Sequence, residues 1–531
     1  MIIIKNIIRK KHFKLLRAQL KGARKLRKEN RPFFVEQVFN DLAKLSVGLN
    51  ENNFPSSLVG AHGVHAESLL RQTLLGRRSI ICAAIMQSIG SGKPAILPAP
   101  DSWIASLESN GIQVNRLGCK LSLYKFAVFN ALKGIVKTVL LMLQYKLPVL
   151  TGKPYTVFMD ITSNNLPVSG QKKSYDIITW YKKSQIKKPE IEEIWAEVRT
   201  NDYYIPPDIY IYQKIFPSFT KWLNFIKYFY KSCISVAVTF SGIIRGKWWY
   251  GLLCYESGLL HYINVINNQD LAREYFFHVS TALYRPLWTY EAEKKGADVN
   301  LFFYSTNMER FKWKYQRLDS DLIKMIKWRN FIVWDEEQKN FLQQYCPKAN
   351  FQVVGSIDFS DSSNIFKANG LQFKIAVFDV TPTRPVFYTS LGWAIAPYWS
   401  EKLTMRFFND IGEIVDPNKV NLFWKQKRIV NYMFIDKGFI RKRDLIINKY
   451  FTAVHPDISA KRLIDESDAV ISMPFTSPSI IGKELGKPSI YFDASGSIEK
   501  QNSHGIPVLK NKNELKNWYN SLNIENVSLH A

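Results

Sequence analysis

Imidazole and hydroxyl side chains that could hold a phosphate lie close together near the end of the chain. His455 and Pro456 follow a short apolar segment, and the apolar run 469–472 leads into the polar turn 475–477 (FTS) and then Pro478. Proline loses no hydrogen bond in the first turn of a helix, and a Ser or Thr before it can cap the free amides. Free amides at the positive end of a helix dipole suit a phosphate. We therefore expect a nucleotide or a sugar phosphate as ligand.

The elements that must position these groups alternate between helix and strand. The pattern predicts a helix over 459–466, a strand over 469–472, a helix over 479–485 that ends at Gly486, and a strand over 489–492. Both polar groups then leave the carboxyl ends of strands that we expect to be neighbours, and open parallel sheets bind ligands at that edge. Capped strand–turn–helix units also occur without a phosphate, so a purely structural role stays open.

Length and pattern predict an α/β protein with two domains, because 531 residues exceed one ordinary core. We divide the chain into a basic leader (1–30), a first α/β domain with helical insertions (31–359), a second Rossmann-like domain (360–510) and a last helix and tail (511–531). The expected strands of the first domain are at 95–100, 111–114, 155–161, 175–180, 193–198, 209–212, 299–304 and 331–334, with another near residue 58 before a His-containing loop. Those of the second are at 373–378, 420–424, 451–455, 469–472 and 489–492.

Positive charge is strongest at the start of a chain whose net charge is +27. Residues 1–30 contain eleven Lys or Arg and one acid, Glu29, with Ile, Leu and Phe between them. Such a helix can lie on an anionic membrane surface, or it can pack on the protein body with a solvated basic face. The longest uncharged apolar runs, 79–92 and 232–244, fall short of the roughly 20 residues that span a bilayer. We expect a cytoplasmic protein, with residues 1–30 as its candidate peripheral contact with the inner membrane.

Cysteine and histidine spacing argues against a structural metal or a disulfide framework. The five cysteines are scattered without a CxxC pair, which fits a reducing compartment. The segment HGVHAE places His62, His65 and Glu67 close together, but in an order that differs from the HExxH zinc motif. We therefore expect no metal.

The His-Pro pair, the hydroxyl-rich turn and the following IIGKELGKPSIYFD together resemble GT-B glycosyltransferases that build bacterial surface polysaccharides. The segment VVGSIDF (353–359) also resembles the one that opens their donor domain. Among these enzymes, a His-Pro motif with a hydroxyl-rich motif is similar to bacterial sialyltransferases and Kdo transferases, which use CMP-activated acidic sugars. The resemblance covers about residues 285–510. The chain departs from sialyltransferases in having no clear counterpart of the Asp/Glu-Asp/Glu-Gly motif that carries their base.

The resemblance implies two Rossmann-like domains that face a central cleft, with the acceptor on the first and the donor on the second. It implies no metal and no cofactor besides the nucleotide-sugar co-substrate, with a CMP-sugar favoured. His455 would bind or protonate the donor phosphate, and Glu484, one helix turn inside, would hold the ribose. The full set of expected donor-binding residues is Asp379, Thr381, Arg384, Lys427, Arg428, His455, Pro456, Ser472, Thr476, Ser477, Ser479 and Glu484.

Transfer also needs a base within hydrogen-bond reach of the acceptor hydroxyl. Asp160, at the end of the strand 155–161, and Glu67, beside His62 and His65, are the two candidates, and the sequence leaves the choice open.

We therefore expect a metal-independent glycosyltransferase that acts on a surface polysaccharide or a lipid-linked acceptor. A CDP-polyol phosphotransferase is the alternative enzyme, because it needs the same phosphate-binding site. A nucleic-acid-binding protein is suggested by the charge and by 26 Tyr and 14 Trp. The aromatic residues lie in apolar helical stretches and no nucleic-acid motif accompanies them, so we expect no specific nucleic acid as partner.

Overall fold

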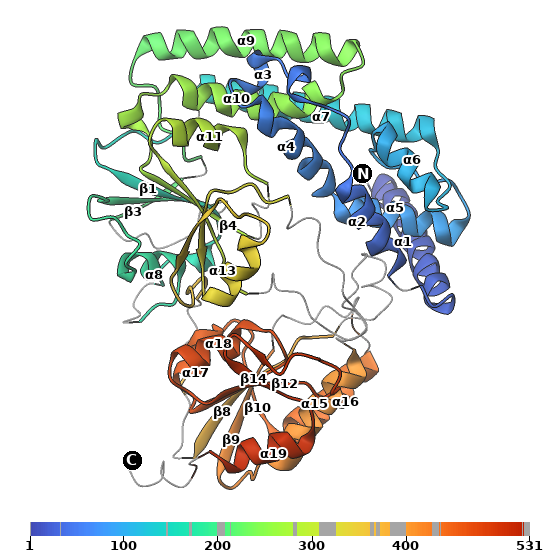
Figure 1. Cartoon of the computed structure of the whole chain (residues 1–531), viewed down its shortest axis with the longest axis vertical. Helices are drawn as coiled ribbons and strands as arrows, with labels where there is room; N and C mark the ends of the chain where they lie inside the picture. The colour runs from blue at the N-terminus through green and yellow to red at the C-terminus, as the bar shows by residue number, and fades with distance from the viewer. Residues whose placement is uncertain are drawn as a thin grey trace.

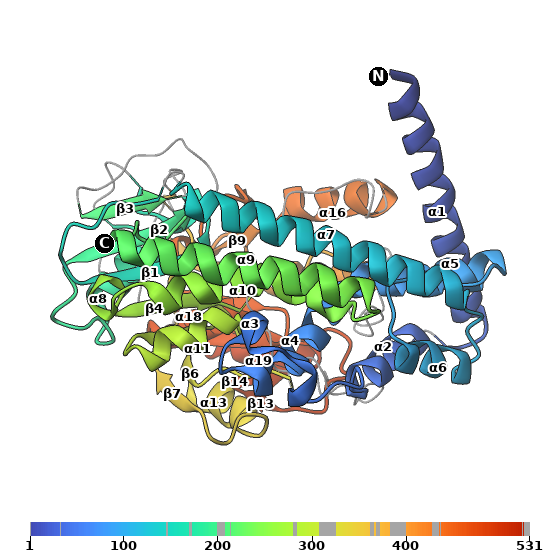
Figure 2. The same ribbon diagram turned by 90° about the horizontal axis from the view of Figure 1, so that it is seen from above.

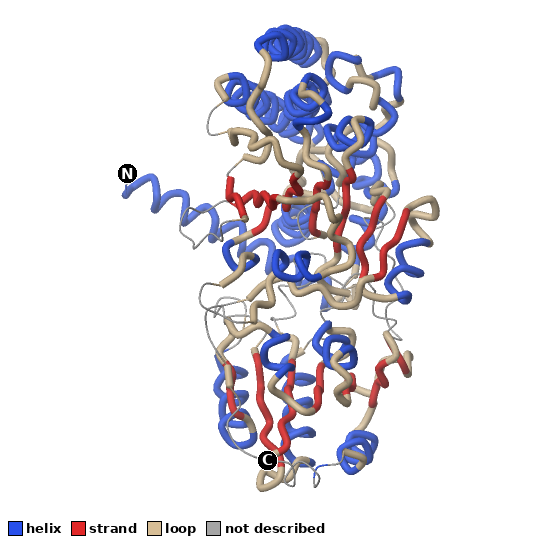
Figure 3. Tube along the Cα trace, turned by 90° about the vertical axis from the view of Figure 1, so that its left-hand side faces the viewer, coloured by secondary structure: helices blue, strands red, loops and turns tan. Residues whose placement is uncertain are grey.

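Two seven-stranded sheets organise the chain, each in its own domain (Figure 1). The computed structural model describes residues 2–524 apart from 32, 145–146, 169–172, 199–207, 213, 280–283, 307–324, 362–365, 368–371, 383–399, 427–434, 436 and 523. Seen from the side, the two sheets are separate groups of strands. Most helices of the first domain lie on the side of the first sheet that is away from the second domain (Figure 3). The prediction of two Rossmann-like α/β domains with a basic N-terminal helix is confirmed.

The first sheet is parallel throughout, in the order β3-β2-β1-β4-β5-β6-β7. Its strands are β1 (Tyr155–Ile161), β2 (Glu193–Val198), β3 (Ile209–Tyr212), β4 (Glu274–His278), β5 (Asp298–Phe302), β6 (Asn330–Val333) and β7 (Asn350–Val353). The central strands are mostly buried and largely apolar, as expected for a sheet with both faces covered. The order reverses between β1 and β4, which is the switch point where doubly wound sheets bind ligands.

Helices cover this sheet and extend it into a helical layer. The helices between its strands include α8 (Ile177–Lys183), α11 (Leu287–Lys294) and α13 (Glu336–Gln343), and α11 lies on the opposite side of the sheet from α8 (Figure 1). The helical layer comprises α1 (Ile2–Lys28), α2 (Phe34–Lys44), α3 (Ser56–Val59), α4 (Gly63–Leu75), α5 (Arg78–Ser91), α6 (Asp101–Ser109), α7 (Arg116–Met142), α9 (Trp222–Ile244) and α10 (Trp249–Val265). A Cβ on Gly251 of α10 would lie 2.5 Å from the Ala127 carbonyl oxygen of α7, so glycine lets these helices pack closely.

The second sheet repeats the order of the first, as β10-β9-β8-β11-β12-β14-β13. Its strands are β8 (Phe373–Phe378), β9 (Val420–Lys425), β10 (Thr452–Val454), β11 (Ala469–Ser472), β12 (Ser489–Phe492), β13 (Asn502–Ser503) and β14 (Ile506–Leu509). Its helices include α15 (Glu401–Ile414), α16 (Lys437–Tyr450), α17 (Ala460–Asp465), α18 (Ser477–Glu484) and α19 (Lys512–Asn520). All pairs are parallel except β13 with β14. The switch point lies between β8 and β11.

The structure differs from the sequence predictions of secondary structure at several elements. Residues 175–180 were predicted as a strand, but Asp176 accepts hydrogen bonds from the amides of Ile178 and Thr179, and this cap starts α8. The region near residue 58 is α3, and the predicted His-containing loop after it is largely α4. The central strand β4 was not predicted, although all five of its residues are buried.

The described part of the N-terminal helix packs on the protein body over its second half. Ala23 and Leu26 of α1 are buried, and α1 crosses α5 so closely that a Cβ on Gly90 would lie 1.9 Å from the Ala18 carbonyl oxygen. None of the helices among the described residues combines the length and the apolar character needed to cross a membrane.

Candidate functional site

The polar turn that opens α18 lies at the switch point of the second sheet. The ends of β8 and β11 are paired there, with Phe378 opposite Ser472. Residues 379–381 continue from β8 and residues 473–477 continue from β11. The sequence prediction that this turn leaves the carboxyl edge of a parallel sheet is confirmed, and this is the position at which such sheets bind ligands.

The turn has an unusual backbone. Phe475 has φ +61°, a left-handed conformation that bulky residues rarely adopt, and its buried ring packs edge-on against Tyr491 at 5.7 Å. Thr476 is the N-cap residue of α18, yet its Oγ1 donates to the Met473 carbonyl at 2.8 Å and caps no amide. The prediction that a Thr or Ser side chain caps α18 was therefore wrong. Pro478 lies in the first turn as predicted.

Ser472 and Ser479 join elements of the core. Their Oγ atoms are 2.6 Å apart, and Ser479 Oγ donates to the Ile490 carbonyl of β12 at 2.8 Å. Both side chains are buried. Their hydroxyls thus hold β11, α18 and β12 together, while Ser477, at the first position of the helix, is only half-buried.

The His-Pro pair lies away from this turn. The sequence predicted that the two motifs leave neighbouring strands, but β9 and β8 lie between β10 and β11. Three strand spacings of about 4.8 Å separate the two strand ends by about 14 Å. His455 is exposed, and its Nδ1 accepts from the Asp457 amide at 3.3 Å. The Pro456 carbonyl accepts from Lys425 Nζ at 3.1 Å, which fixes this segment to the end of β9.

Polar groups at the end of β8 line the switch point. Asp379 is buried and accepts from Trp424 Nε1 at 3.1 Å. Burial lowers the pKa of Lys425, although Asp379 and Asp457 favour its charged form. Thr381 Oγ1 is buried and has no hydrogen-bond partner among the residues that the structure describes. Arg384, Lys427 and Arg428, the other expected donor-binding residues, lie outside the described residues.

Glu484 is the last residue of α18, about two turns from Thr476, and not one turn inside the helix as predicted. Its Oε2 accepts from the amide of Ser356, in the segment between the two sheets, at 2.8 Å. Glu484 therefore links the two domains in this structure.

Asp160 lies at the switch point of the first sheet, near the end of β1. It is half-buried with φ +56°, and the pairing of β1 with β2 shifts register between Phe158 and Ile161. His278, at the end of the neighbouring β4, donates from Nε2 to the Asp160 carbonyl at 3.1 Å. Burial lowers the pKa of His278, against the opposing effect of its hydrogen bond to Asp160. The sequence reasoning missed His278, because its strand was not predicted.

Glu67, the other candidate base, is on α4 in the helical layer. It accepts from Ser46 Oγ at 3.0 Å and from the Val47 amide at 3.2 Å. His62 Nε2 is 3.0 Å from Glu291 Oε2, and His65 stacks on Tyr290 at 3.9 Å. Burial, aided by Arg285, lowers the pKa of His65 to about 4. Across the described residues, no three His, Cys, Asp or Glu side chains are grouped so that they could hold a metal ion.

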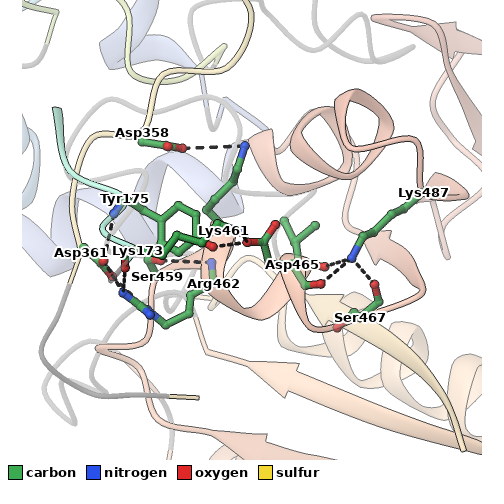
Figure 4. A network of polar contacts seen from close by, with 11 residues as sticks. Lys173, Tyr175, Asp358, Asp361, Ser459, Lys461, Arg462, Asp465, Ser467 and Lys487 are labelled. Atoms are coloured by element: carbon green, nitrogen blue, oxygen red, sulfur yellow. Dashed lines mark hydrogen bonds and ion pairs between the residues drawn. The ribbon is translucent and has the colours of Figure 1, made fainter. Parts of the chain in front are cut away.

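The segment after β7 joins the carboxyl edge of the first sheet to the second domain. Phe359 stacks on Tyr304 at 4.2 Å beside His278, and Asp361 pairs with Arg462 of α17 through Nε at 3.2 Å and Nη2 at 2.5 Å (Figure 4). Asp361 also accepts from the Tyr175 amide at 3.0 Å. Asp361 thus joins the backbone of the first domain at Tyr175 to Arg462 of the second domain through a buried carboxylate.

Comparison with known proteins gives one family match. A family model described as "Polysaccharide biosynthesis PFTS motif protein" matches residues 190–519. The four residues Pro474 to Ser477 spell P-F-T-S, so the motif in that description is the turn that opens α18. No curated protein matches the chain.

Several solved structures show a distant likeness to the chain. The "OtsA apo structure" and the structure described as "Trehalose-6-phosphate from E. coli bound with UDP-2-fluoro glucose" are each 8% identical, with a TM-score of 0.32. A UDP-forming α,α-trehalose-phosphate synthase from Burkholderia xenovorans is 7% identical, with a TM-score of 0.31. Each match covers 71% of this chain and 93% of the other.

Proposed function

The chain belongs to the polysaccharide biosynthesis PFTS motif family, and we propose that it is a glycosyltransferase of the GT-B type. It moves a sugar from a nucleotide-activated donor to a surface polysaccharide or a lipid-linked acceptor. One observation carries the proposal: the family's motif opens a helix at the switch point of the second of two Rossmann-like sheets. Nucleotides bind doubly wound sheets at this point.

The donor phosphate binds between the start of α18 and the end of β8. The side chain of the N-cap residue, Thr476, does not cap α18, and the Thr381 hydroxyl has no partner among the described residues. These donors stabilise the charge that develops on the leaving phosphate. The His-Pro resemblance favours a CMP-linked acidic sugar, with His455 contacting a part of the donor distant from Thr476.

Asp160 is the better candidate for the base. It belongs to the first switch point, beside the segment that leads to the second domain, whereas Glu67 is on α4 in the helical layer. The acceptor hydroxyl oxygen attacks the anomeric carbon and gives its proton to the Asp160 carboxylate. The bond from that carbon to the phosphate oxygen breaks, and the nucleotide leaves with the electron pair.

Thermal-shift measurements with CMP, CDP, UMP, UDP and GDP test the donor site, because a ligand that binds the folded state raises Tm by mass action. The panel is run on the wild type, Thr381→Val, His455→Ala and Thr452→Val. Thr452 begins β10 and so lies at the opposite edge of the same sheet, which makes it a matched control. We expect a CMP-selective shift that both site variants reduce and Thr452→Val keeps.

Each other outcome has a definite meaning. Selectivity for UDP or GDP would keep the glycosyltransferase and overturn the CMP donor. Selectivity for CDP would favour the polyol-phosphate transferase. If Thr381→Val keeps the Tm shift, the nucleotide does not bind at this switch point. If the folded protein shows no Tm shift with any nucleotide, nucleotide binding is overturned.

A further inference from the structure

Two long helices of the first domain expose apolar side chains along one face each. Among them are Leu121, Leu132 and Val136 of α7 and Ile226, Tyr230 and Ile244 of α9, which are between 44% and 84% exposed. Their spacings follow the helical repeat, so each set lies on one side of its helix. The helices α7 and α9 pack against each other and lie side by side on α10 (Figure 2). We call their combined outward surface the α7–α9 face.

The helix α9 has its polarity inverted relative to a helix that covers a soluble core. Asn224, Ser232, Ser235 and Thr239 point into the protein and are buried, while the outward side carries the large apolar residues. A surface helix normally buries its apolar side and exposes its polar side. A contiguous apolar surface of this kind marks an interaction site. The α7–α9 face therefore needs an apolar cover.

Charge indicates what the cover is. Neither Arg116–Met142 nor Trp222–Ile244 contains an Asp or Glu. Lys125, Lys133 and Lys227 on the two helices and Arg245 just after α9 are exposed among the apolar residues. Two copies of this acid-free face would repel each other, whereas anionic lipid headgroups would attract it.

We propose that the α7–α9 face docks on an anionic lipid bilayer, with both helices lying in the plane of the membrane interface. None of the described helices is suited to span a bilayer, and an in-plane helix with apolar and basic side chains is the usual form of interfacial binding. This surface is separate from residues 1–30, and the proposal does not depend on the sugar transfer.

Vesicle co-sedimentation of the full chain tests the docking. The wild type is compared on phosphatidylcholine vesicles with and without phosphatidylglycerol. The double variant Leu132→Glu/Tyr230→Glu removes apolar contacts at exposed positions, and Leu445→Glu is the control, because Leu445 is an exposed leucine on α16 of the second domain. We expect the double variant to lose about tenfold or more in vesicle affinity and the control to lose none.

Charge-removing variants separate the two components of the interface. Lys125→Gln, Lys133→Gln and Lys227→Gln should each lower affinity for phosphatidylglycerol vesicles about fivefold at low salt. Their effect should shrink at high salt, because exposed charges are screened.

A cysteine on α9 gives a direct readout of burial in lipid. Cys233 is exposed on the outward side, between Tyr230 and Ile234, while Cys82, Cys119 and Cys254 are buried. An environment-sensitive fluorophore on Cys233 should shift its emission to the blue when vesicles are added and should be quenched by a spin-labelled lipid. Cys233→Ser, treated in the same way, reports the signal of any other labelled site.

Three results would overturn the proposal. The first is equal sedimentation of the wild type and Leu132→Glu/Tyr230→Glu. The second is a Cys233 label whose emission ignores vesicles. The third is a dimer in light scattering that the double variant converts to monomer, since a second copy would then cover the face.

Discussion

At the scale of single residues, the motif that names the family acts mainly through its backbone. Phe475 adopts a left-handed backbone conformation. Such a conformation costs about 1–3 kcal/mol and persists where the surrounding structure enforces it. Its ring packs on Tyr491 and Thr476 bonds back to Met473, so both side chains hold the turn. The result is that α18 starts at the switch point with amides that its N-cap side chain does not cap.

Asp160 provides the first residue-scale prediction. Asparagine adopts the left-handed conformation readily, so Asp160→Asn should keep the backbone at φ +56° while it removes the base. We expect donor-dependent sugar transfer to fall at least about 100-fold while the nucleotide-induced Tm shift stays unchanged. The rate of sugar transfer, measured as nucleotide release, is compared between Asp160→Asn and Glu67→Gln, which removes the other candidate base. Loss of activity in Glu67→Gln alone would reverse the assignment.

At the scale of elements, strands that are rich in apolar residues were predictable from sequence. The strands 155–161, 193–198, 209–212, 373–378, 469–472 and 489–492 have the predicted bounds. The sequence could not show the order of strands in a sheet, because that order depends on contacts between distant segments. His455 was therefore placed beside the turn at Thr476, although two strands separate them. His278 was not predicted as a site residue for a related reason, because its contact with Asp160 depends on the pairing of distant strands.

The join between the domains gives the element-scale prediction. The Asp361 side chain is fully buried and the Arg462 side chain is 11% exposed, so removing one partner leaves an uncompensated charge. We expect Asp361→Asn and Arg462→Met each to destabilise the protein by about 3–5 kcal/mol. The double variant should cost much less than their sum, which denaturant unfolding measures.

Lys173 supplies the control for that experiment. It pairs with Asp465 in the same network, but its side chain is 65% exposed (Figure 4). Exposed pairs contribute about 0–1 kcal/mol, so Lys173→Ala should change the free energy of unfolding little. Strictly additive effects of Asp361→Asn and Arg462→Met would show that the pair does not couple the domains.

At the scale of the whole molecule, the proposed membrane-binding face and the proposed donor domain lie at opposite ends. The helix α9 lies at one end of the molecule and the second domain at the other (Figure 1). In between, one apolar core contains residues of both sheets, such as Phe302 and Val377, together with Ile357 of the connecting segment. A membrane at the α7–α9 face would thus meet the domain to which we assign the acceptor, and the donor domain would face away from it.

Because the core continues through the connecting segment, a charge buried there should change the stability of the whole molecule. Asp358 is beside Ile357, its side chain is 19% exposed, and Lys461 Nζ is 3.8 Å from its Oδ1. Burial raises the pKa of Asp358 to about 6, against the opposing effect of Lys461. The folded state therefore holds this proton more tightly than the unfolded state, in which the pKa is about 3.9. Its stabilising contribution is complete below pH 4 and is lost as the pH rises through 6.

The prediction is that Asp358→Asn removes this part of the pH dependence. Between pH 4 and pH 7 the free energy of unfolding of the wild type should fall relative to that of the variant by about 3 kcal/mol at most, since each pKa unit is worth about 1.4 kcal/mol. Denaturant unfolding of both proteins at pH 4.5, 5.5, 6.5 and 7.5 measures the difference. Lys461→Met should make the fall steeper, because it removes the cation that favours the carboxylate. A difference that stays constant over this range would show that Asp358 ionises normally in the folded protein.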